Sequence, residues 1–505
     1  MQETLTMLLP LTLLLVAMVV RLYTVTSAIA RTLLRRNVVV SDLVTAHRLL
    51  VRGSSGGAFS NRPPSALASL LSRGRYENLN SAPYGPFWRA MRRNLTSGVL
   101  HPMRLHRYAV ARSQALRGLV ADLSQQCGSS PDGLVLAAES IRSTLFGLLV
   151  AMCFGNGVHA GLVRVMVHAQ NEIVQLAPHT SILMKLPGAV AKIIYRQRWS
   201  RLVTLRRQQE ETYLPLIDAR RVRHRHSGIG EPPAYVDTLI DLRVPDEHGH
   251  VSSVDMRRRK RRLTDGELVG LCSEFVGAGT DTVAAELQWI MANLVKRPDM
   301  QDAIRREIDA AVDADAQEVS EEAVGKLEYL NAIVMESLRL HPPVSAVSRQ
   351  VKEGDDVVVH GRRVPPGTVV AFPPNRLARD GKVWADPDEF KPERFLDSDG
   401  GKSVSLLAAA GSAGEMRMMP FGAGRRMCPG MRLAILHLGY FTANLVREFE
   451  WREAEGELAV DLQPHFGFFT VMKRPLRAHL VLRRREAKQK CSLSKLTVCE
   501  KTQKC

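Results

Sequence analysis

The chain has 505 residues, of which 45% are hydrophobic and 6% aromatic, and its formal net charge is +18. This composition is ordinary for a globular protein, so it excludes a chain that is disordered throughout. The length suggests about three or four domains, unless one large helical fold takes up most of it. The positive charge favours acidic proteins, anionic membrane surfaces or nucleic acid as partners, but it does not determine the fold.

The N-terminal residues 1–30 are predicted to anchor the chain in a membrane. Residues 5–20 carry no charge, and a helix of that length covers about 24 Å of the roughly 30 Å hydrocarbon core. Basic residues follow this segment and Glu3 precedes it, so the positive-inside bias places the bulk of the chain in the cytosol. The alternative is a cleaved secretory signal, because residues 28–30 resemble a cleavage site, although the basic region that begins such a signal is missing.

The first half of the chain after the anchor is predicted to be mainly helical. A short strand at 38–40 is followed by a helix over 42–51, and Pro86 begins a helix that extends to residue 100. Residues 102–225 have a mostly helical pattern. Glycine or proline interrupts this pattern at 128–133, 155–157 and 187–188. The sequence has no period of 20 to 50 residues, so a repeat array is not expected.

Three segments are predicted to be loops, the first of them at residues 53–57. Residues 61–64, Asn-Arg-Pro-Pro, form a rigid connector. Residues 228–262 are polar and end in a run of six basic residues, 257–262. Such a run is found in nucleic-acid patches, but stacking aromatic residues do not accompany it. We therefore interpret it as a solvated loop and expect no nucleic-acid partner.

The second half contains the longest predicted helix. Residues 264–267, Thr-Asp-Gly-Glu, have a capping-box pattern, and a helix from there to Pro298 would be about 50 Å long. Two further helices are expected over 299–312 and 320–340. A small β portion follows, with strands at 357–359, 369–372, 465–472 and 479–482 and a last helix at 432–449.

Cys428 lies in a glycine-rich segment, Phe-Gly-Ala-Gly-Arg-Arg-Met-Cys-Pro-Gly, at residues 421–430. The seven cysteines of the chain include no CxxC pair and no Cys/His cluster with zinc spacing, which is typical of a reducing compartment. A thiolate that binds haem iron pushes electron density onto it and favours O–O cleavage. Backbone N–H groups and a helix N-terminus stabilise such a thiolate. We therefore predict that Cys428 is the axial ligand of haem iron.

Four other residues of this segment are expected to contact the haem. Gly424 and Gly430 allow close backbone approach to the porphyrin. Phe421 packs on the sulfur side, and Arg426 pairs with a propionate. The segment matches the signature F-x-x-G-x-R-x-C-x-G at every fixed position. A chance match to five fixed residues, each at roughly 5% usage, arises on the order of once in ten thousand such chains.

With this signature the chain resembles the cytochrome P-450 superfamily. The phrases at 271–275, 287–291 and 418–421 are most similar to plant family 89, subfamily A. The resemblance covers about residues 37–485 and implies a mainly α fold with a small β-rich lobe around a buried haem b. Residues 486–505 are predicted to be a polar, disordered tail.

Further motifs of the superfamily occur in the expected order. Glu336 and Arg339 share a helix face, and Arg394 would complete a Glu–Arg–Arg cluster that braces the haem core. Without the cysteine segment, this pair would be an ordinary surface ion pair of little energetic worth. Trp88 and Arg92 lie one helical turn apart, so both can reach a propionate. Arg349 is either another propionate partner or a surface residue.

The segment at residues 278–282, Ala-Gly-Thr-Asp-Thr, resembles the superfamily's oxygen-activation motif in mid-helix. Ala278 and Gly279 would line the haem, with Gly279 leaving room for O₂. The Thr282 hydroxyl is expected to bond a carbonyl of its own helix or a water. Asp281 would relay protons through water.

The N-terminal part departs from the family pattern. Members carry a proline-rich hinge after the anchor, followed by a helix and two strands. The stretch between the anchor and Asn37 contains no proline, so this part of the domain is shortened. A missing strand would leave its neighbour unpaired.

The resemblance implies a monooxygenase that inserts one atom of O₂ into a small, largely apolar substrate. Electrons would come from NADPH through a membrane-bound reductase, whose acidic docking face suits the net charge. The anchor implies the endoplasmic reticulum membrane, with the catalytic domain in the cytosol. Substrate contacts are expected at 65–80, 275–278, 344–347 and 466–470, but the sequence does not identify the substrate.

Two alternatives stay open. One is a haem-thiolate isomerase or dehydratase that needs no reductase, although relatives of that kind usually disturb the Asp-Thr pair or the haem loop. The other is a non-catalytic, membrane-tethered remnant that fails to hold haem because of its shortened N-terminus.

Overall fold

The computed structural model describes residues 38–52, 57–64, 78–131, 133–183, 195–226, 234–246, 260–354, 357–396, 404–411, 415–456 and 459–483. The predicted anchor, the predicted tail, the break at 187–188 and most of the substrate segment 65–80 lie outside these residues.

Helices make up most of the described chain. The longer ones are α4 (Pro86–Gly98), α6 (Ala109–Ser129), α7 (Ala137–Phe154), α8 (Ala160–Leu183), α10 (Arg196–His226), α12 (Asp265–Lys296), α13 (Pro298–Ala311), α15 (Glu328–Leu340) and α17 (Met431–Glu448). The shorter ones are α2 (Leu43–His47), α5 (Pro102–Leu105), α11 (Tyr235–Ile240), α14 (Glu321–Val324) and α16 (Pro374–Leu377). Single turns of other helix types are η1 (Arg48–Arg52), η3 (His106–Tyr108), η4 (Pro392–Phe395), η5 (Leu406–Ala410) and η6 (Gly424–Arg426).

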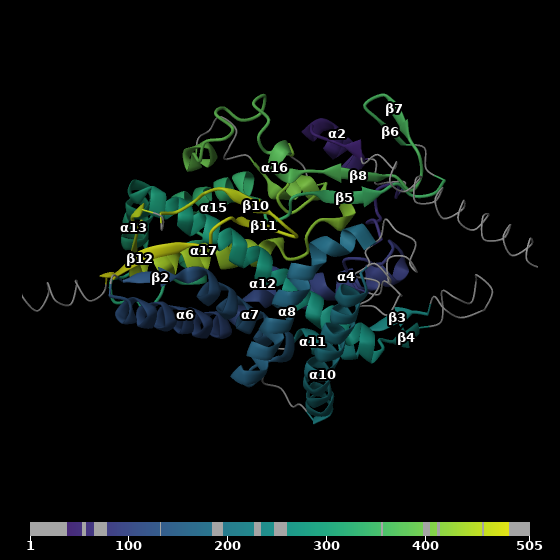
Figure 1. Ribbon diagram of the computed structural model, residues 1–505, viewed down its shortest axis with the longest axis horizontal. Coiled ribbons are helices and arrows are strands. Elements are labelled where there is room, and N and C mark those ends of the chain that lie inside the picture. Colours follow the sequence, from purple (N-terminus) through teal and green to yellow (C-terminus); the bar gives the residue numbers. More distant parts are fainter. Residues whose placement is uncertain are drawn as a thin grey trace, which may run out of the picture.

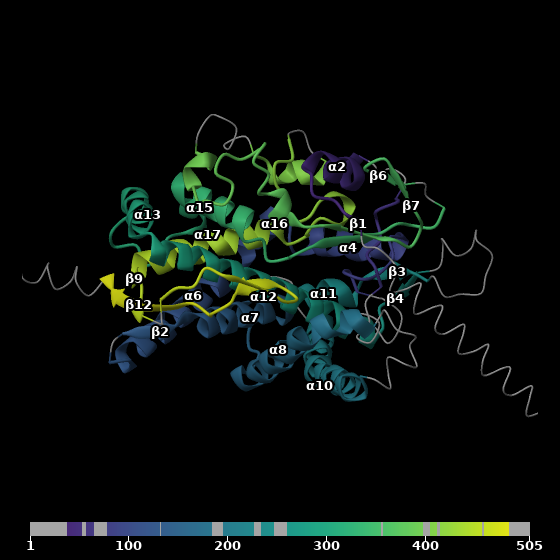
Figure 2. The ribbon, with the colours of Figure 1, turned by 45° about the horizontal axis from the view of Figure 1, so that its top comes forward.

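Helix α12 crosses the middle of the molecule (Figures 1 and 2). The predicted capping box is confirmed: the Thr264 hydroxyl accepts a hydrogen bond from the Glu267 N–H, and the Glu267 carboxylate accepts one from the Thr264 N–H. Helices α7 and α10 pack on one side of α12, and α15 and α17 pack on the other. Most of its residues are therefore buried, so an accessible position in the middle of the helix indicates a space beside it.

The strands form small sheets around this helical body. One sheet has the order β1 (Val38–Val39), β8 (Val369–Phe372), β5 (Val347–Gln350), with β1 parallel to β8. A second has the order β2 (Leu134–Leu136), β12 (Arg477–Leu482), β9 (Phe449–Arg452). Two-stranded pairs are β3 (Arg243–Pro245) with β4 (Lys260–Arg262), β6 (Val357–Val359) with β7 (Arg362–Val364), and β10 (Pro464–Phe466) with β11 (Thr470–Met472).

Three sequence predictions are wrong in detail. The helix expected over 320–340 is divided into α14 and α15, because the backbone at Leu327 is extended, with a ψ of 96°, and so interrupts the helix. The strand expected over 465–472 is a hairpin, because the Gly467 N–H donates to the Phe469 carbonyl and the chain turns back. The end of the basic run is not a loop, since residues 260–262 pair with β3.

The two largest hydrophobic clusters among the described residues form most of the core. The larger one joins α4, α6, α7, α12, α15 and α17. The smaller one joins α2, η1, β6, β7 and β8 to the segment before α17. Phe421 packs against both clusters, so the predicted cysteine loop lies at the junction between them.

Helix α7 is long and apolar enough to cross a membrane by length and composition. However, 61% of it is buried inside the protein. It packs along α12, so these properties fit a core helix equally well.

Candidate active site

The loop that carries Cys428 is held by its own backbone. The Cys428 N–H donates to the Phe421 carbonyl over 2.9 Å. Gly424 has a φ of +68°, and a Cβ added there would lie 2.0 Å from the Leu50 carbonyl oxygen. A glycine is therefore required at this position for the loop to pack against η1, which is a reason that the sequence pattern did not reveal.

The Cys428 sulfur faces an internal space. Its residue is accessible to solvent, yet enough protein surrounds it for burial to raise the pKa of the thiol. The Gly430 N–H bonds to the sulfur, and the charges of Arg92 and Arg62 act on it, so all three lower that pKa. The expected N–H donor to a thiolate is thus present.

A stripe of accessible residues on α12 marks the same kind of hollow. Glu274, Ala278 and Thr282 follow one another at intervals of four, which places them on one helix face. All three are at least partly accessible, whereas nearly all other residues of α12 between 271 and 287 are buried. A space beside a helix that is otherwise packed is what a flat, buried cofactor requires.

The oxygen-activation segment divides its side chains between two faces. The Thr282 hydroxyl donates to the Ala278 carbonyl over 2.8 Å, as predicted. The Asp281 carboxylate is buried, and it accepts hydrogen bonds from Arg142 of α7 at 2.6 Å and from Gln170 of α8 at 3.2 Å. Its role as a proton relay stays a prediction.

Gly279 has a packing role that the sequence did not indicate. A Cβ added there would lie 2.8 Å from Leu149 Cδ1 of α7. The glycine therefore lets α7 and α12 approach closely. The expectation that it leaves room for O₂ stays a prediction.

Arginine side chains gather around the Cys428 loop. Arg349 and Arg426 are buried, and Arg62 and Arg92 are half-buried. Arg349 is therefore not a surface residue, which removes one of the two interpretations of it. Burial is the largest cause of a lowered pKa at all four, and neighbouring guanidiniums lower it further at Arg92, Arg349 and Arg426.

The charges of these four arginines indicate whether haem fits the site. Four guanidiniums close enough to disfavour one another's charge need anionic partners. Glu274 supplies one carboxylate, whose charge raises the pKa of Arg62 and Arg426. The Arg62 Nε is buried and has no hydrogen-bond partner among the described residues. Two propionates would meet these needs, so the residues present fit the cofactor.

Arg62 was missed by the sequence analysis, which interpreted residues 61–64 as a connector. Asn61 precedes it and two prolines follow it, so the local pattern predicts only a stiff turn. Contact with the cysteine loop arises from the tertiary fold.

Trp88 and Arg92 lie together, as predicted. The Arg92 guanidinium is 5.9 Å from the Trp88 ring centre, and the Arg426 guanidinium is 4.5 Å from it on the same indole. The Trp88 Nε1–H donates to the Leu79 carbonyl over 3.0 Å. The indole therefore joins α4 to the cysteine loop.

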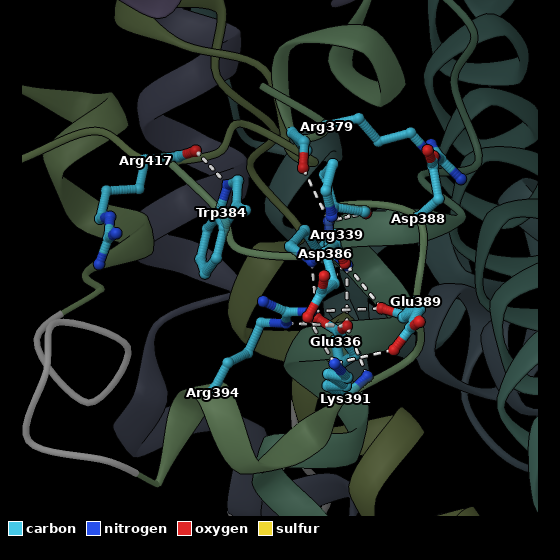
Figure 3. Close-up of polar contacts among 12 residues, drawn as sticks. Glu336, Arg339, Arg379, Trp384, Asp386, Asp388, Glu389, Lys391, Arg394 and Arg417 are labelled. Atoms are coloured by element: carbon cyan, nitrogen blue, oxygen red, sulfur yellow. Dashed lines mark hydrogen bonds and ion pairs between the residues drawn. The ribbon is translucent and has the colours of Figure 1, made fainter. Parts of the chain in front are cut away.

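The predicted Glu–Arg–Arg cluster is present (Figure 3). Glu336 and Arg339 are fully buried and joined by two hydrogen bonds of 2.7 and 2.8 Å. Arg394 donates to the same carboxylate over 3.1 Å. Arg339 also donates to three backbone carbonyls, at Ala378, Pro387 and Glu389. The cluster thus fixes the segment 378–394 against α15.

Similarity to known proteins agrees with this geometry. The sequence model of the family described as Cytochrome P450 matches residues 31–480. Cytochrome P450 89A9 of Arabidopsis thaliana is 37% identical over 450 residues, which cover 88% of this chain and 84% of that protein. Trimethyltridecatetraene synthase of Zea mays is 29% identical, over 83% of this chain and 76% of that protein.

The fold is similar to solved structures as well. A structure of zebra fish cytochrome P450 with progesterone has a TM-score of 0.68 and 22% sequence identity, and the match covers 88% of this chain and 93% of that one.

The helical body, the cysteine loop and the arginine cluster define an enzyme of the haem-thiolate class. The chain belongs to the cytochrome P450 family, and the similarity to the Arabidopsis protein supports its place in plant family 89. It is therefore a cytochrome P450 monooxygenase that uses haem iron.

Proposed function

We propose that this enzyme oxidises a small, largely apolar organic molecule with O₂ and with electrons from NADPH, delivered by a membrane-bound cytochrome P450 reductase. The observation that carries the proposal is the joint position of Cys428 and the arginine cluster. A sulfur that receives the Gly430 N–H and faces an internal space next to Arg62 and Arg92 suits an anionic, iron-binding group. We place the catalytic domain at 37–485 and an anchor at 1–30 in the endoplasmic reticulum membrane, with the domain in the cytosol.

The position of each residue suggests its role in haem binding. Cys428 would hold the iron, and Arg62, Arg92, Arg349 and Arg426 would hold the propionates. Bound there, haem supplies the activation of O₂ that the reaction requires. Phe421, Gly424 and Gly430 shape the sulfur side, and Ala278 and Gly279 belong to the opposite wall.

Asp281 and Thr282, which also belong to α12, take part in proton delivery. The Thr282 hydroxyl donates its hydrogen bond to the Ala278 carbonyl, so its oxygen lone pairs stay free to accept a hydrogen bond from a water. Asp281 holds its negative charge against Arg142, and the proton path to the hollow depends on how this ion pair opens. Glu336, Arg339 and Arg394 brace the scaffold and do not react.

A spectrum tests the proposal directly. The reduced, CO-treated protein is expected to show the strongly red-shifted Soret band of thiolate ligation. Cys428→Ala should abolish this band, whereas Cys127→Ala should keep it, because Cys127 bonds to the Leu480 carbonyl in a different part of the fold. A wild-type spectrum typical of histidine ligation, or a protein that takes up no haem, would overturn the proposal and favour a non-catalytic remnant.

A reductase-independent isomerase or dehydratase is the second candidate. One relative, from Zea mays, is named a synthase. NADPH consumption that is coupled to product supports the monooxygenase. Turnover that continues without NADPH or reductase supports the second candidate.

A further inference from the structure

The Asp281 carboxylate is held by two helices other than its own. Its Oδ1 atom accepts from the Arg142 guanidinium of α7, through Nε at 2.9 Å and through a terminal nitrogen at 2.6 Å. Its Oδ2 atom accepts from the Gln170 side-chain amide of α8 over 3.2 Å. The carboxylate is therefore held beside α7 and α8, and not on the accessible face of α12 that carries Ala278 and Thr282.

Gly277 provides the space in which the Gln170 amide lies. It precedes Asp281 by one helical turn, so the two residues share a face of α12. A Cβ added at Gly277 would lie 2.9 Å from Cδ and 3.1 Å from Oε1 of Gln170, and it would lie closer still to the amide nitrogen. The amide thus lies over the bare backbone of this turn. A side chain at position 277 would displace the amide, whereas the helices could stay in place, because the amide is the end of a flexible side chain.

The two oxygens of Asp281 are held with unequal strength. Two hydrogen bonds from one guanidinium hold Oδ1, and bonds between two charged groups are short and strong. One neutral amide holds Oδ2, at a distance near the long end of the normal range. Opening at Oδ2 therefore costs less free energy than opening at Oδ1. It follows that Gln170 determines how readily Asp281 can turn.

We propose that Gln170 is a positioning residue that lies over Gly277 and holds Oδ2 of Asp281 on the side of α8 until this oxygen takes part in proton delivery. The inference rests on the proposed function, since it concerns the route by which protons reach the hollow. When the amide releases Oδ2, Arg142 keeps Oδ1. The freed oxygen can then exchange a proton with a water that also bonds to the Thr282 hydroxyl.

Two variants remove the amide contact in different ways. Gln170→Ala deletes the amide, and Gly277→Ala displaces it. Both should have the same effect, and the double variant should resemble Gln170→Ala, because the added Cβ then has no amide to displace. Gln175→Ala, at an exposed position of α8, is the control for the first variant. Gly270→Ala in α12 is the control for the second, because a Cβ there meets no neighbouring group within 4 Å.

The stretching frequency of CO on the reduced, haem-loaded full chain is the first measurement, because this frequency responds to charges near the bound CO. Gln170→Ala and Gly277→Ala should both shift the wild-type band or add a second band, since the freed carboxylate can turn toward the hollow. The two controls should keep the wild-type band. In an Asp281→Asn background, Gln170→Ala should cause no shift, because the charge that moves is then absent.

The solvent isotope effect on O₂ consumption, driven by NADPH and a cytochrome P450 reductase, is the second measurement. Reduction of O₂ takes up protons, so slow proton delivery makes the reaction slower in D₂O. Loss of one hydrogen bond to a charged acceptor should make the open arrangement roughly ten to a hundred times more frequent. Proton delivery then limits the rate less, so the isotope effect should fall in Gln170→Ala and Gly277→Ala and stay unchanged in the controls.

Urea unfolding gives a readout that needs neither CO nor turnover. Alanine stabilises a helix relative to glycine, so Gly277→Ala should raise the unfolding midpoint in the Gln170→Ala background. In the wild-type background the loss of the amide contact opposes this gain, and the midpoint should rise less or fall. Gly270→Ala should act equally in both backgrounds.

The inference is overturned by an unchanged CO band in both variants, by an isotope effect that stays at the wild-type value, or by an equal midpoint change for Gly277→Ala in both backgrounds. A protein without the thiolate CO spectrum contradicts the proposed function instead, so the two failures are distinguishable.

Discussion

At Arg62, a guanidinium with an unpartnered, buried Nε faces the cysteine loop. Burial lowers its pKa, while the charges of Glu274 and Cys428 raise it. An anion placed there gains a charge-assisted hydrogen bond and offsets the repulsion among the four arginines. Arg62 is thus the residue at which haem binding relieves an electrostatic cost that the apoprotein carries.

Arg62→Met should therefore weaken haem retention. We expect haem transfer to a scavenger such as apomyoglobin to be faster by a factor of roughly ten to a hundred, the equivalent of one hydrogen bond to a charged group. Arg425→Met, at an exposed position of the same loop, serves as the control and should transfer haem at the wild-type rate. Equal rates for both variants would remove Arg62 from the site.

Titration of the buried Glu286 side chain is expected to make the free energy of unfolding depend on pH. Burial raises its pKa from the ordinary value of 4.5 to about 8, and neither oxygen of its carboxyl group has a hydrogen-bond partner among the described residues. A carboxyl with a raised pKa in the folded state binds its proton more tightly there, so stability falls as the pH rises through this interval and levels off above about 8.

Glu286→Gln should remove this dependence. At about pH 5 the variant and the wild type should unfold at similar denaturant concentrations, and by about pH 8 the variant should be more stable by on the order of a few kcal/mol. Urea unfolding at several pH values measures this difference. A stability difference that does not change with pH would show that Glu286 does not titrate in this interval.

At the residue scale, the sequence predicted those functional residues that belong to short motifs. Cys428, Glu336 and Arg339 belong to local patterns that keep their meaning without the fold. Gln170 and Asp281 are 111 positions apart in the chain, and no local pattern joins them. Residues that act through such distant contacts become visible only in the folded structure.

At the element scale, helix α15 joins the haem region to the segment 378–394. Arg339 satisfies the buried Glu336 carboxylate and three carbonyls of that segment. Trp384 packs against this group, with its ring centre 5.4 Å from the Arg339 guanidinium. Side-chain hydrogen bonds from this cluster thus hold the irregular segment 378–394, as backbone hydrogen bonds would hold a strand in a sheet.

Arg339→Ala should be strongly destabilising. It leaves the fully buried Glu336 with less of its charge compensated, and breaking such a pair costs about 3–5 kcal/mol. Lys326→Ala breaks an exposed pair with Glu322 and should cost less than about 1 kcal/mol. Chemical denaturation of both variants makes the comparison. A small effect of Arg339→Ala would mean that Arg394 alone can compensate the carboxylate.

Elements were predicted best where periodicity or caps extend over many residues. Helix α12 begins at its capping box and ends before Pro298, as expected. The helix expected over 320–340 is interrupted at Leu327, whose backbone is extended, and an apolar residue in a helical pattern gives no sign of such a break. Strands β2, β5 and β9 have three or four residues each, which is too short for alternation to be recognised.

At the scale of the whole molecule, the charge of +18 bears on association with an electron donor. Long-range attraction between a basic and an acidic protein speeds their encounter and is screened by salt. This effect does not depend on which arginines make contact in the complex, since the summed field of the protein acts before contact.

Electron transfer from a purified acidic cytochrome P450 reductase should therefore slow as salt is added. Between about 0.01 M and about 0.15 M ionic strength, where the Debye length falls from about 30 Å to about 8 Å, the second-order rate should drop on the order of tenfold. Chemical reduction by dithionite is the control and should change little. A rate that salt does not alter would argue against steering by this charge.

Phe421 touches both hydrophobic clusters, and this has a consequence for how the protein matures. The ring that steadies the cysteine loop finds its full surroundings only after the two halves of the interior have each collapsed and met. Partly folded chains in which only one of the two clusters has formed should therefore lack a complete binding site for haem iron. Acquisition of the prosthetic group would then act as a late checkpoint during biosynthesis, separating completed molecules from partly folded ones.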